Sequence, residues 1–344
     1  MRIGGGGRRR ETVLWDVRGV LGGSLRTLTI AAPVAYVIAL AIAVISDGPP
    51  VAHDALFLWL GLGMAAFSVS AWRRWGLMLV EWLPFFGLLI LYDYVRGAVS
   101  VDAQHAHVQA QIAVDRALFF GQVPSVWLQR HLYEAGHIRP LDIASWCVYM
   151  THFFAVWVTA AILWRVAHDR FRRYVALTVL VTLAALVTYW RFPAQPPWMA
   201  SQLGDIGQVD RIVPEVWGHL GVQDGRTFFE TGNGLVNVVA AMPSLHASYP
   251  LMLLLFFWPA GWAARIGFGL YTLAMGFVLV YGAEHFVTDI LVGWAFTLAA
   301  FGALAALERV RPGLPAFRRR PPPHAAKPAP SGSPAWMQAS DSGG

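Results

Sequence analysis

Lysine and cysteine are almost missing from this chain, and charged side chains of any kind are few. Only 13% of its 344 residues are charged and 56% are hydrophobic, whereas soluble domains carry about 25% charge. This composition excludes an ordinary soluble protein and indicates several membrane-spanning helices. The single cysteine, Cys147, excludes an internal disulfide and a cysteine-based metal cluster. Lys327 is the only lysine, so every other basic side chain except histidine is arginine.

The formal net charge of +6 comes from basic residues in short segments between long apolar runs. That distribution follows the positive-inside rule of membrane proteins and argues against nucleic acid as a partner. A helix needs about 20 apolar residues to cross a bilayer. The sequence therefore predicts an all-α fold, a polytopic transmembrane helical bundle of about eight spans. The expected spans are 27–45, 55–72, 75–95, 142–164, 174–192, 244–259, 263–282 and 285–306.

The segments outside these spans complete the expected organisation. Residues 1–25 are predicted to form a basic cytoplasmic arm, and residues 309–344, rich in Pro, Ser, Ala and Gly, a disordered cytoplasmic tail. Residues 26–141 are expected to contain the N-terminal transmembrane helices. Within them, segment 97–141 is too polar to span and is predicted to form one or two helices on the outer surface.

The arginine-rich loops all fall on one side of the membrane under this count, and that side is predicted to be cytoplasmic. Both termini then lie in the cytoplasm, and loops 46–54, 96–141 and 193–243 lie outside. The chain is expected to be an integral protein of the plasma membrane.

The first of three polar patches runs from Arg191 to Trp198 at the outer end of the fifth expected span. It contains three prolines, which end the helix and impose a stiff extended turn. Arg191 and Trp198 have two interpretations. They could be an interfacial anchor pair, or Arg191 could bind a phosphate group.

The second patch, Pro-Ser-Leu-His, ends at His246 and opens the sixth expected span. Ser244 is a candidate helix cap, and the free backbone N–H groups of a helix start suit an anionic phosphate. His246 would lie in the first turn, where it could donate a proton to a departing alkoxide. The alternative is an interfacial histidine bonded to a loop carbonyl.

The third patch contains His285 and, four residues later, Asp289, a spacing that places both on one helix face. An ionised Asp within a membrane helix costs about 2.5–3.5 kcal/mol, so Asp289 needs a partner. An Asp289 carboxylate that accepts from one ring nitrogen would fix the tautomer of His285 and present the other nitrogen as a nucleophile. The alternative is a purely structural pair. The occurrence of all three patches on one side of the membrane favours a function.

Pro-Ser-Leu-His followed about forty residues later by His-x-x-x-Asp resembles the type 2 phosphatidic acid phosphatase superfamily over about residues 142–306. The stretch Phe-Pro-Ala-Gln-Pro-Pro-Trp more closely resembles its inositol phosphorylceramide synthase branch. The resemblance implies a six-helix, phosphatase-like catalytic core within residues 142–308. It also implies that His285 attacks phosphorus to form a phosphohistidine, that His246 protonates the leaving alcohol and that Asp289 orients His285. No metal and no cofactor are expected.

Two phosphate-binding charges of the plain phosphatase branch are missing. No lysine precedes Lys327, Arg191 is followed by Phe192 rather than proline, and Leu279 stands six residues before His285, where that branch has arginine. The absences favour transfer of a headgroup over simple removal of phosphate.

Other groups must then bind the phosphate. Arg191 is the first candidate, together with Ser244 and the helix start that follows it. Arg96 and Arg211 are weaker candidates.

The sequence leaves three functional hypotheses. The first is a lipid phosphotransferase that moves a phosphoryl-linked headgroup of the inositol-phosphate type from a membrane phospholipid donor to a lipid alcohol acceptor on the external face. The second is a lipid or polyprenyl phosphate phosphatase with the same triad and water as acceptor. The third is a non-catalytic transporter or scaffold.

The remaining histidines have other interpretations. His152 is interpreted as a structural histidine of the bundle. His105 and His107, two residues apart, would face different directions and are not expected to bind metal.

Overall fold

The computed structural model describes residues 8–47, 53–69, 106–221 and 239–310, with a few positions between 76 and 91. The regular elements of this part of the chain are helices, which confirms the all-α prediction. They are α1 (Arg8–Asp47), α2 (His53–Phe67), α4 (Gln109–Leu118), α5 (Pro124–Leu132), α6 (Pro140–Met150), α7 (His152–Val166), α8 (His168–Arg191), α9 (Pro197–Gln202), α10 (Ile212–His219), α12 (Leu245–Phe257), the 3-10 turn η4 (Trp258–Ala260), α13 (Trp262–Tyr281) and α14 (Val287–Val310).

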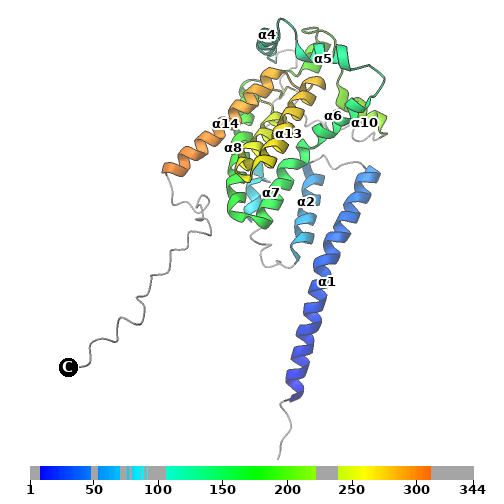
Figure 1. The fold of residues 1–344 in the computed structure, drawn as a ribbon, viewed down its shortest axis with the longest axis vertical. Helices are drawn as coiled ribbons and strands as arrows, with labels where there is room; N and C mark the ends of the chain where they lie inside the picture. The colour runs from blue at the N-terminus through cyan, green and yellow to red at the C-terminus, as the bar shows by residue number, and fades with distance from the viewer. Residues whose placement is uncertain are drawn as a thin grey trace, which may run out of the picture.

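The long helices form a bundle, and the short helices gather at one of its ends. Figure 1 shows α7, α8, α13 and α14 side by side, with α4 and α5 at their upper ends and α10 beside α6. Helix α12 packs against both α13 and α14. Helix α1 packs against α2 and extends well beyond the bundle in the opposite direction. The short-helix end is where the expected functional residues lie.

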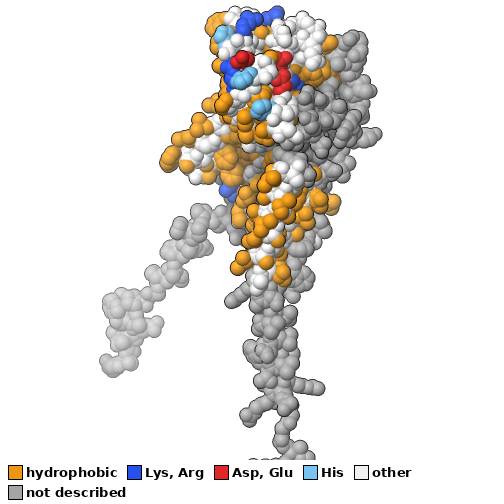
Figure 2. Space-filling view, turned by 90° about the vertical axis from the view of Figure 1, so that its right-hand side faces the viewer, with side chains coloured by type: hydrophobic (Ala, Val, Ile, Leu, Met, Phe, Trp, Pro, Cys, Tyr) orange, Lys and Arg blue, Asp and Glu red, His pale blue; other side chains and the backbone are white. Residues whose placement is uncertain are grey.

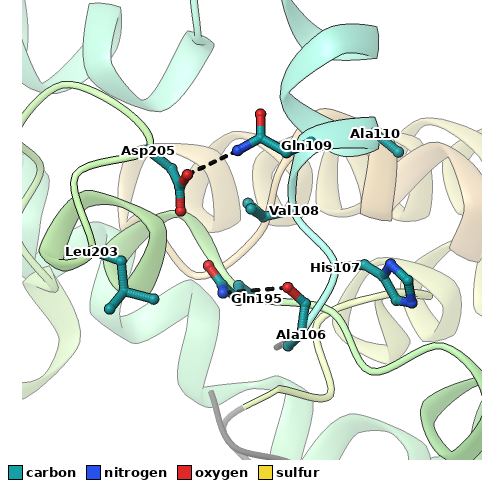
Figure 3. Close-up of a pocket in the computed structure, with 8 residues that line it drawn as sticks. All are labelled: Ala106, His107, Val108, Gln109, Ala110, Gln195, Leu203 and Asp205. Carbon is teal, nitrogen blue, oxygen red and sulfur yellow. Dashed lines mark hydrogen bonds between the residues drawn. The ribbon is translucent and has the colours of Figure 1, made fainter. Parts of the chain in front are cut away.

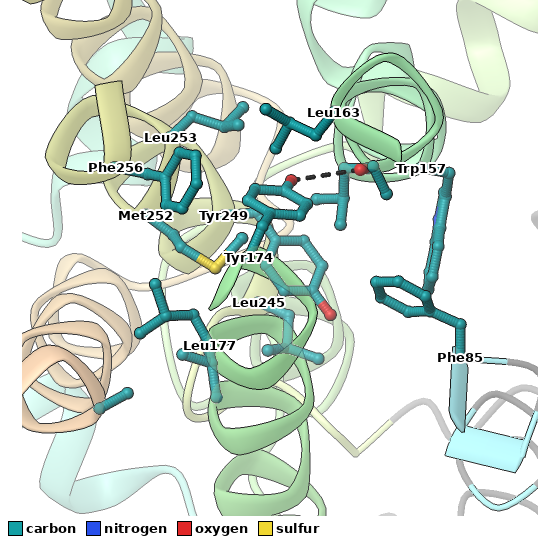
Figure 4. Close-up of a cluster of buried hydrophobic side chains, with 14 of the residues drawn as sticks. Phe85, Trp157, Leu163, Tyr174, Leu177, Leu245, Tyr249, Met252, Leu253 and Phe256 are labelled. Atoms are coloured by element: carbon teal, nitrogen blue, oxygen red, sulfur yellow. Dashed lines mark hydrogen bonds between the residues drawn. The ribbon is translucent and has the colours of Figure 1, made fainter. Parts of the chain in front are cut away.

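The core between α7, α8 and α12 is aromatic and aliphatic (Figure 4). Tyr174, Leu177 and Met252 are fully buried within it. Its buried hydroxyls are paired, since the Tyr174 hydroxyl donates to the Val156 carbonyl over 3.2 Å. Pairing removes the cost of burying such polar groups in an apolar interior. This core fixes the position of α12, whose first turn carries His246.

Helices α12 and α14 approach each other unusually closely. A Cβ atom on Gly293 would lie 2.5 Å from the backbone oxygen of Ser244 and 2.8 Å from the Ser248 hydroxyl. Ser248 Oγ lies 2.7 Å from the Ser244 carbonyl and 3.0 Å from that of Gly293. Small residues permit this backbone contact between membrane helices. It holds the start of α12 against the start of α14.

Four helices in the described part of the chain are long and apolar enough to cross a membrane: Thr27–Ser46 within α1, and α8, α13 and α14. A fifth candidate is the pair α6 and α7, which is bent by 41°. Leu270 and Leu273 on α13 and Leu298 on α14 are among the large apolar side chains that are more than half exposed. Figure 2 shows hydrophobic side chains below a cap of charged and polar ones. The protein is an integral membrane protein.

The prediction of eight spans is not reproduced by this count. Expected spans 55–72 and 244–259 correspond to shorter apolar helices, Leu58–Phe67 and Leu245–Ala260. Helix α12 has 13 residues and is therefore about 20 Å long, less than the hydrocarbon thickness of about 30 Å. Most of expected span 75–95 lies outside the described residues.

The helix boundaries differ from the predictions in two further places. Helix α1 begins at Arg8, so residues 8–25 of the expected basic arm are helical. The expected span 142–164 is broken at Thr151 into α6 and α7. Segment 97–141, predicted to form one or two short helices, contains α4 and α5. The predicted tail after residue 310 lies outside the described residues.

Candidate active site

His246 lies in the first turn of α12, at the short-helix end of the bundle. Ser244 is the N-cap, as predicted, and its side chain accepts from the backbone N–H of Ala247 over 3.2 Å. The N–H of Ser244 donates to the backbone carbonyl of Asp289 over 3.0 Å. The two motifs that lie some forty residues apart in the sequence are therefore joined through their main chains.

His285 lies in the tight turn between α13 and α14, two residues before α14 begins. The sequence placed His285 and Asp289 on one helix face, and the structure brings them together across the helix start. Nδ1 of His285 lies 3.5 Å from Oδ2 of Asp289. The same oxygen accepts from the backbone N–H of Phe286 over 2.9 Å. Asp289 is fully buried and His285 is 6% exposed, so their interaction is weakly screened.

The two histidines of the motifs face each other. The ring centroids of His246 and His285 are 5.5 Å apart and their planes are inclined by 52°. A third imidazole, that of His152 at the start of α7, stacks on His246 with its centroid 3.7 Å away. Tyr149 of α6 lies against the same ring at 4.8 Å. The break between α6 and α7 thus places two aromatic side chains against His246.

Helix α4 holds the start of α14 through two buried side chains. Gln111 Nε2 donates to Oδ1 of Asp289 over 2.8 Å. One turn along α4, the Asp115 carboxylate accepts from the backbone N–H groups of Val287 and Thr288, at 3.0 and 2.9 Å, and from the Thr288 hydroxyl at 2.7 Å. Burial is the largest influence on Asp115 and raises its pKa, against the opposite effect of the hydrogen bonds from Thr288 and Val287.

The proline-rich loop connects three parts of the site. Ala194 bridges to His107 on one side and to Ala240 on the other, so the loop lies between the start of α4 and the segment before α12. The backbone N–H of Trp198 donates to the carbonyl of Ala283, two residues before His285, over 3.1 Å. Arg191 is exposed at the end of α8, and its guanidinium carbon lies 5.6 Å from the ring of Trp190. That placement matches the anchor interpretation of Arg191.

Arg211 forms an ion pair beside the turn that carries His285. Its Nε is 2.8 Å from Oε1 of Glu284, and its second contact to that carboxylate is 3.1 Å long. The guanidinium carbon is 4.9 Å from the ring of Trp198. Glu284 directly precedes His285 in the chain, and its side chain is 7% exposed. The positive charge of Arg211 is therefore largely balanced by a buried carboxylate.

A cavity of about 530 Å³ opens beside the start of α4 (Figure 3). Gln109 and Asp205 face each other across it, with Gln109 Nε2 donating to Oδ1 of Asp205 over 2.8 Å. Gln195 forms another part of the wall, and its side chain donates to the carbonyl of Ala106 over 3.4 Å. The volume falls within the usual range for small-molecule sites, about 300–1,000 Å³.

Comparison with known proteins identifies the family. A profile of the PAP2 superfamily matches residues 109–303. The chain belongs to the PAP2 superfamily. This confirms the resemblance to the type 2 phosphatidic acid phosphatases. The chain is also 24% identical, over 238 residues, to the phosphoinositol dihydroceramide synthase of Bacteroides thetaiotaomicron, across 62% of this chain and 72% of that protein. No solved structure matches the chain significantly.

The PAP2 match begins at Gln109, the first residue of α4. The matched region therefore starts earlier than the sequence resemblance over residues 142–306 indicated, and it includes Gln111 and Asp115. Sequence reasoning missed both of these residues, because segment 97–141 was interpreted only as a surface layer. Their i, i+4 spacing on a short polar helix was the available signal. His152 was named, but as a structural histidine away from the chemistry.

The structure describes some of the remaining candidate site residues. Ser244 is buried and its hydroxyl oxygen is engaged in capping. Arg96 and His105 lie outside the described residues. His107 stacks on Phe192 with centroids 3.9 Å apart. Among the described side chains, no group of three or more His, Cys, Asp or Glu residues is arranged to hold a metal ion.

Proposed function

We propose that this PAP2 protein is a membrane lipid phosphotransferase. It moves a phosphoryl-linked headgroup, of the inositol-phosphate type, from a phospholipid donor to an alcohol-bearing lipid acceptor. The observation that carries the proposal is the meeting of His285, backed by the buried Asp289, with His246 at a centroid distance of 5.5 Å. The name of the Bacteroides thetaiotaomicron relative, a phosphoinositol dihydroceramide synthase, supports this class of reaction.

The proposed reaction has two displacements at phosphorus. In the first, Nε2 of His285 forms a bond to phosphorus as the bond to the donor's diacylglycerol oxygen breaks, and His246 gives its proton to that leaving oxygen. In the second, the acceptor hydroxyl loses its proton to His246 and attacks phosphorus, which breaks the phosphorus–nitrogen bond and restores both histidines. Oδ2 of Asp289, which lies 3.5 Å from Nδ1 of His285 in the structure, is proposed to accept a hydrogen bond from Nδ1 during the reaction and to stabilise the positive charge that develops on the ring.

The surroundings of the triad suggest how substrate is bound. The proposed contacts of the phosphoryl group and lipid are Arg211, Trp198 and the positive end of the α12 helix dipole. Arg191, at the exposed end of α8, is proposed to contact the donor at the membrane surface. The cavity beside Gln195 offers two amides and one carboxylate, a set that suits hydroxyl groups better than a second phosphate.

Topology completes the proposal. The short-helix end is proposed to face the outside of the cell, because arginines such as Arg170, Arg172 and Arg173 lie near the opposite end of the bundle, at the start of α8. Segment 75–95 and the shorter helices α2 and α12 would complete eight spans, with both termini in the cytoplasm. A reporter fused after Gly344 should remain inside the cell; an external reporter would contradict this orientation.

The test of function uses purified protein in lipid nanodiscs. Phosphatidylinositol labelled in its headgroup is supplied with and without a ceramide-type acceptor. Wild type should form a new labelled lipid only with acceptor, with or without EDTA, and His285→Ala, His246→Ala and Asp289→Ala should each abolish or strongly reduce it. Full turnover by His285→Ala would exclude the proposed catalytic role of His285. Release of free phosphate from a lipid monophosphate, with no new lipid under any condition, would favour the phosphatase alternative.

A further inference from the structure

Helix α4 contributes one side chain to the site that neither motif contains. Gln111 is fully buried and bonds to the carboxylate that faces His285. We propose that Gln111 is a positioning residue, which holds Asp289 in the orientation that His285 requires. This inference rests on the proposed function, because it assigns Gln111 a part in the same reaction.

The donors around Asp289 carry the argument. Oδ1 accepts from Gln111 Nε2 at 2.8 Å, and Oδ2 accepts from the Phe286 N–H at 2.9 Å. With one short hydrogen bond on each oxygen, the carboxylate cannot rotate without breaking both. Oδ2, held in this way, is the oxygen that lies 3.5 Å from Nδ1 of His285. Gln111 thus fixes the plane of the group that orients the nucleophile.

The chemistry of an amide suits this position. An ionised carboxylate only accepts hydrogen bonds, so its neighbour must be a donor. A cation on Oδ1 would neutralise Asp289 and reduce its attraction to a developing positive charge on His285. A neutral amide binds the oxygen and leaves the negative charge in place.

The position of Gln111 is itself fixed from two sides. Nε2 also lies 3.4 Å from the backbone carbonyl of Gln195, in the proline-rich loop. The chain before α4 pairs with that loop, since the N–H of His107 donates to the Pro193 carbonyl over 2.8 Å. Asp115 then anchors α4 to the first turn of α14. The proline-rich loop therefore helps to fix the position of α4 and of Gln111.

A second buried glutamine provides the contrast. Gln129 on α5 is 5% exposed and belongs to the same layer of short helices. Its amide donates to the backbone carbonyls of Asp210 and Tyr281, both at 2.8 Å. Those contacts join elements of the fold and involve no side chain of the triad. Gln129 is thus a matched control for the structural effect of losing a buried amide.

The experiment compares Gln111→Met, Gln111→Glu and Gln129→Met in the acceptor-dependent assay, with His285→Ala as reference. Gln111→Met keeps the side-chain length but removes the donor. Loss of a hydrogen bond to a charged group should lower kcat by about ten- to a hundredfold, with KM changed by less than about threefold. Gln129→Met should lower the unfolding temperature and leave kcat within about threefold.

Gln111→Glu supplies a readout that a purely structural role would not change. Near neutral pH its carboxylate repels Asp289, whereas its protonated form at lower pH can again donate a hydrogen bond. Its kcat relative to that of Gln111→Met should therefore rise as pH falls. The other titratable groups near this point, Asp115 on α4 and His285 in the turn, are present in both variants, so the ratio removes their contribution.

The outcomes separate the two proposals. If His285→Ala is inactive and Gln111→Met is as active as wild type, the role of Gln111 is wrong while the proposed function stands. The proposed role of Gln111 would also be wrong if the ratio of the kcat of Gln111→Glu to that of Gln111→Met did not change with pH. If either Gln111 variant fails to fold, the kcat of the other can still be compared with that of wild type at low pH. That comparison tests whether residue 111 must donate a hydrogen bond. Full activity of His285→Ala would instead contradict the proposed function.

Discussion

His152 and His246 stack ring on ring, with centroids 3.7 Å apart and planes 25° from parallel. His246 is the proposed proton donor, and its ring must be held edge-on to the leaving oxygen. Stacking leaves the ring nitrogens at the edge of the pair, because the faces are occupied. We therefore expect His152 to orient the ring of His246.

Replacing His152 tests this relationship. His152→Phe keeps an aromatic face against His246 and should retain most of the wild-type kcat. His152→Ala removes the stack, and the loss of an aromatic contact should lower kcat by about two- to tenfold. Steady-state turnover of labelled donor lipid measures both. If the Phe variant were as inactive as His246→Ala, His152 would have a chemical role rather than an orienting one.

The Arg211–Glu284 pair should be structural as well as substrate-binding. Arg211→Ala leaves a carboxylate that is 7% exposed without its cation, at an expected cost of about 1–3 kcal/mol of unfolding free energy, given the partial exposure of Arg211. The double variant Arg211→Ala/Glu284→Gln should recover part of that loss, which a double-mutant cycle of denaturant unfolding in detergent would measure. A higher KM for Arg211→Ala with no loss of stability would contradict the structural part.

The positions of His246, His285 and Asp289 could be predicted from the sequence because their information is local. An intramembrane Asp four residues after a His requires a nearby partner, and Pro-Ser-Leu-His carries its own helix start. Asp289 and Ser244 accordingly lie where the spacing placed them. The long apolar helices were predictable for the same reason, since length and composition decide them.

Gln111, Asp115 and His152 could not be assigned in this way. Gln111 and Asp289 are 178 residues apart, and nothing in a short polar helix indicates which distant turn it will cap. His152 meets His246 because the span breaks at Thr151, and the apolar pattern on both sides of that break is continuous. The surroundings of Arg191 could not be predicted either. Its neighbours are suggestive in sequence, but the end of α8 directs it to the exposed surface beside Trp190.

Asp115 should make stability depend on pH. Burial raises the pKa of this carboxyl in the folded protein, so the folded state binds a proton more readily than the unfolded chain. Its favourable contribution is complete below the unfolded pKa of about 4 and is lost as pH rises through the higher folded value. Asp115→Asn cannot titrate. The wild-type unfolding temperature minus that of Asp115→Asn should therefore decrease as pH rises from about 4 to 7. A difference that stayed constant or increased would show that Asp115 is not protonated in this range.

The approach of α12 to α14 at Gly293 should be essential for activity. A methyl group there would lie 2.5 Å from the Ser244 carbonyl, and a backbone atom cannot move aside as a flexible side chain can. Gly293→Ala should therefore separate the two helix starts, cost about 1–3 kcal/mol of stability and reduce kcat, because His246 and Asp289 lie on opposite sides of this contact.

Gly302, further along the same helix, is the matched control. A Cβ atom there meets nothing within 4 Å, and alanine is the better helix former by about 1 kcal/mol. Gly302→Ala should leave kcat unchanged and the unfolding temperature unchanged or raised, as measured by turnover and thermal unfolding in the same detergent. Equal behaviour of the two variants would mean that the α12–α14 contact does not set the distance between the histidines. A selective loss in Gly293→Ala would instead show that the catalytic geometry depends on a glycine that touches neither substrate nor triad.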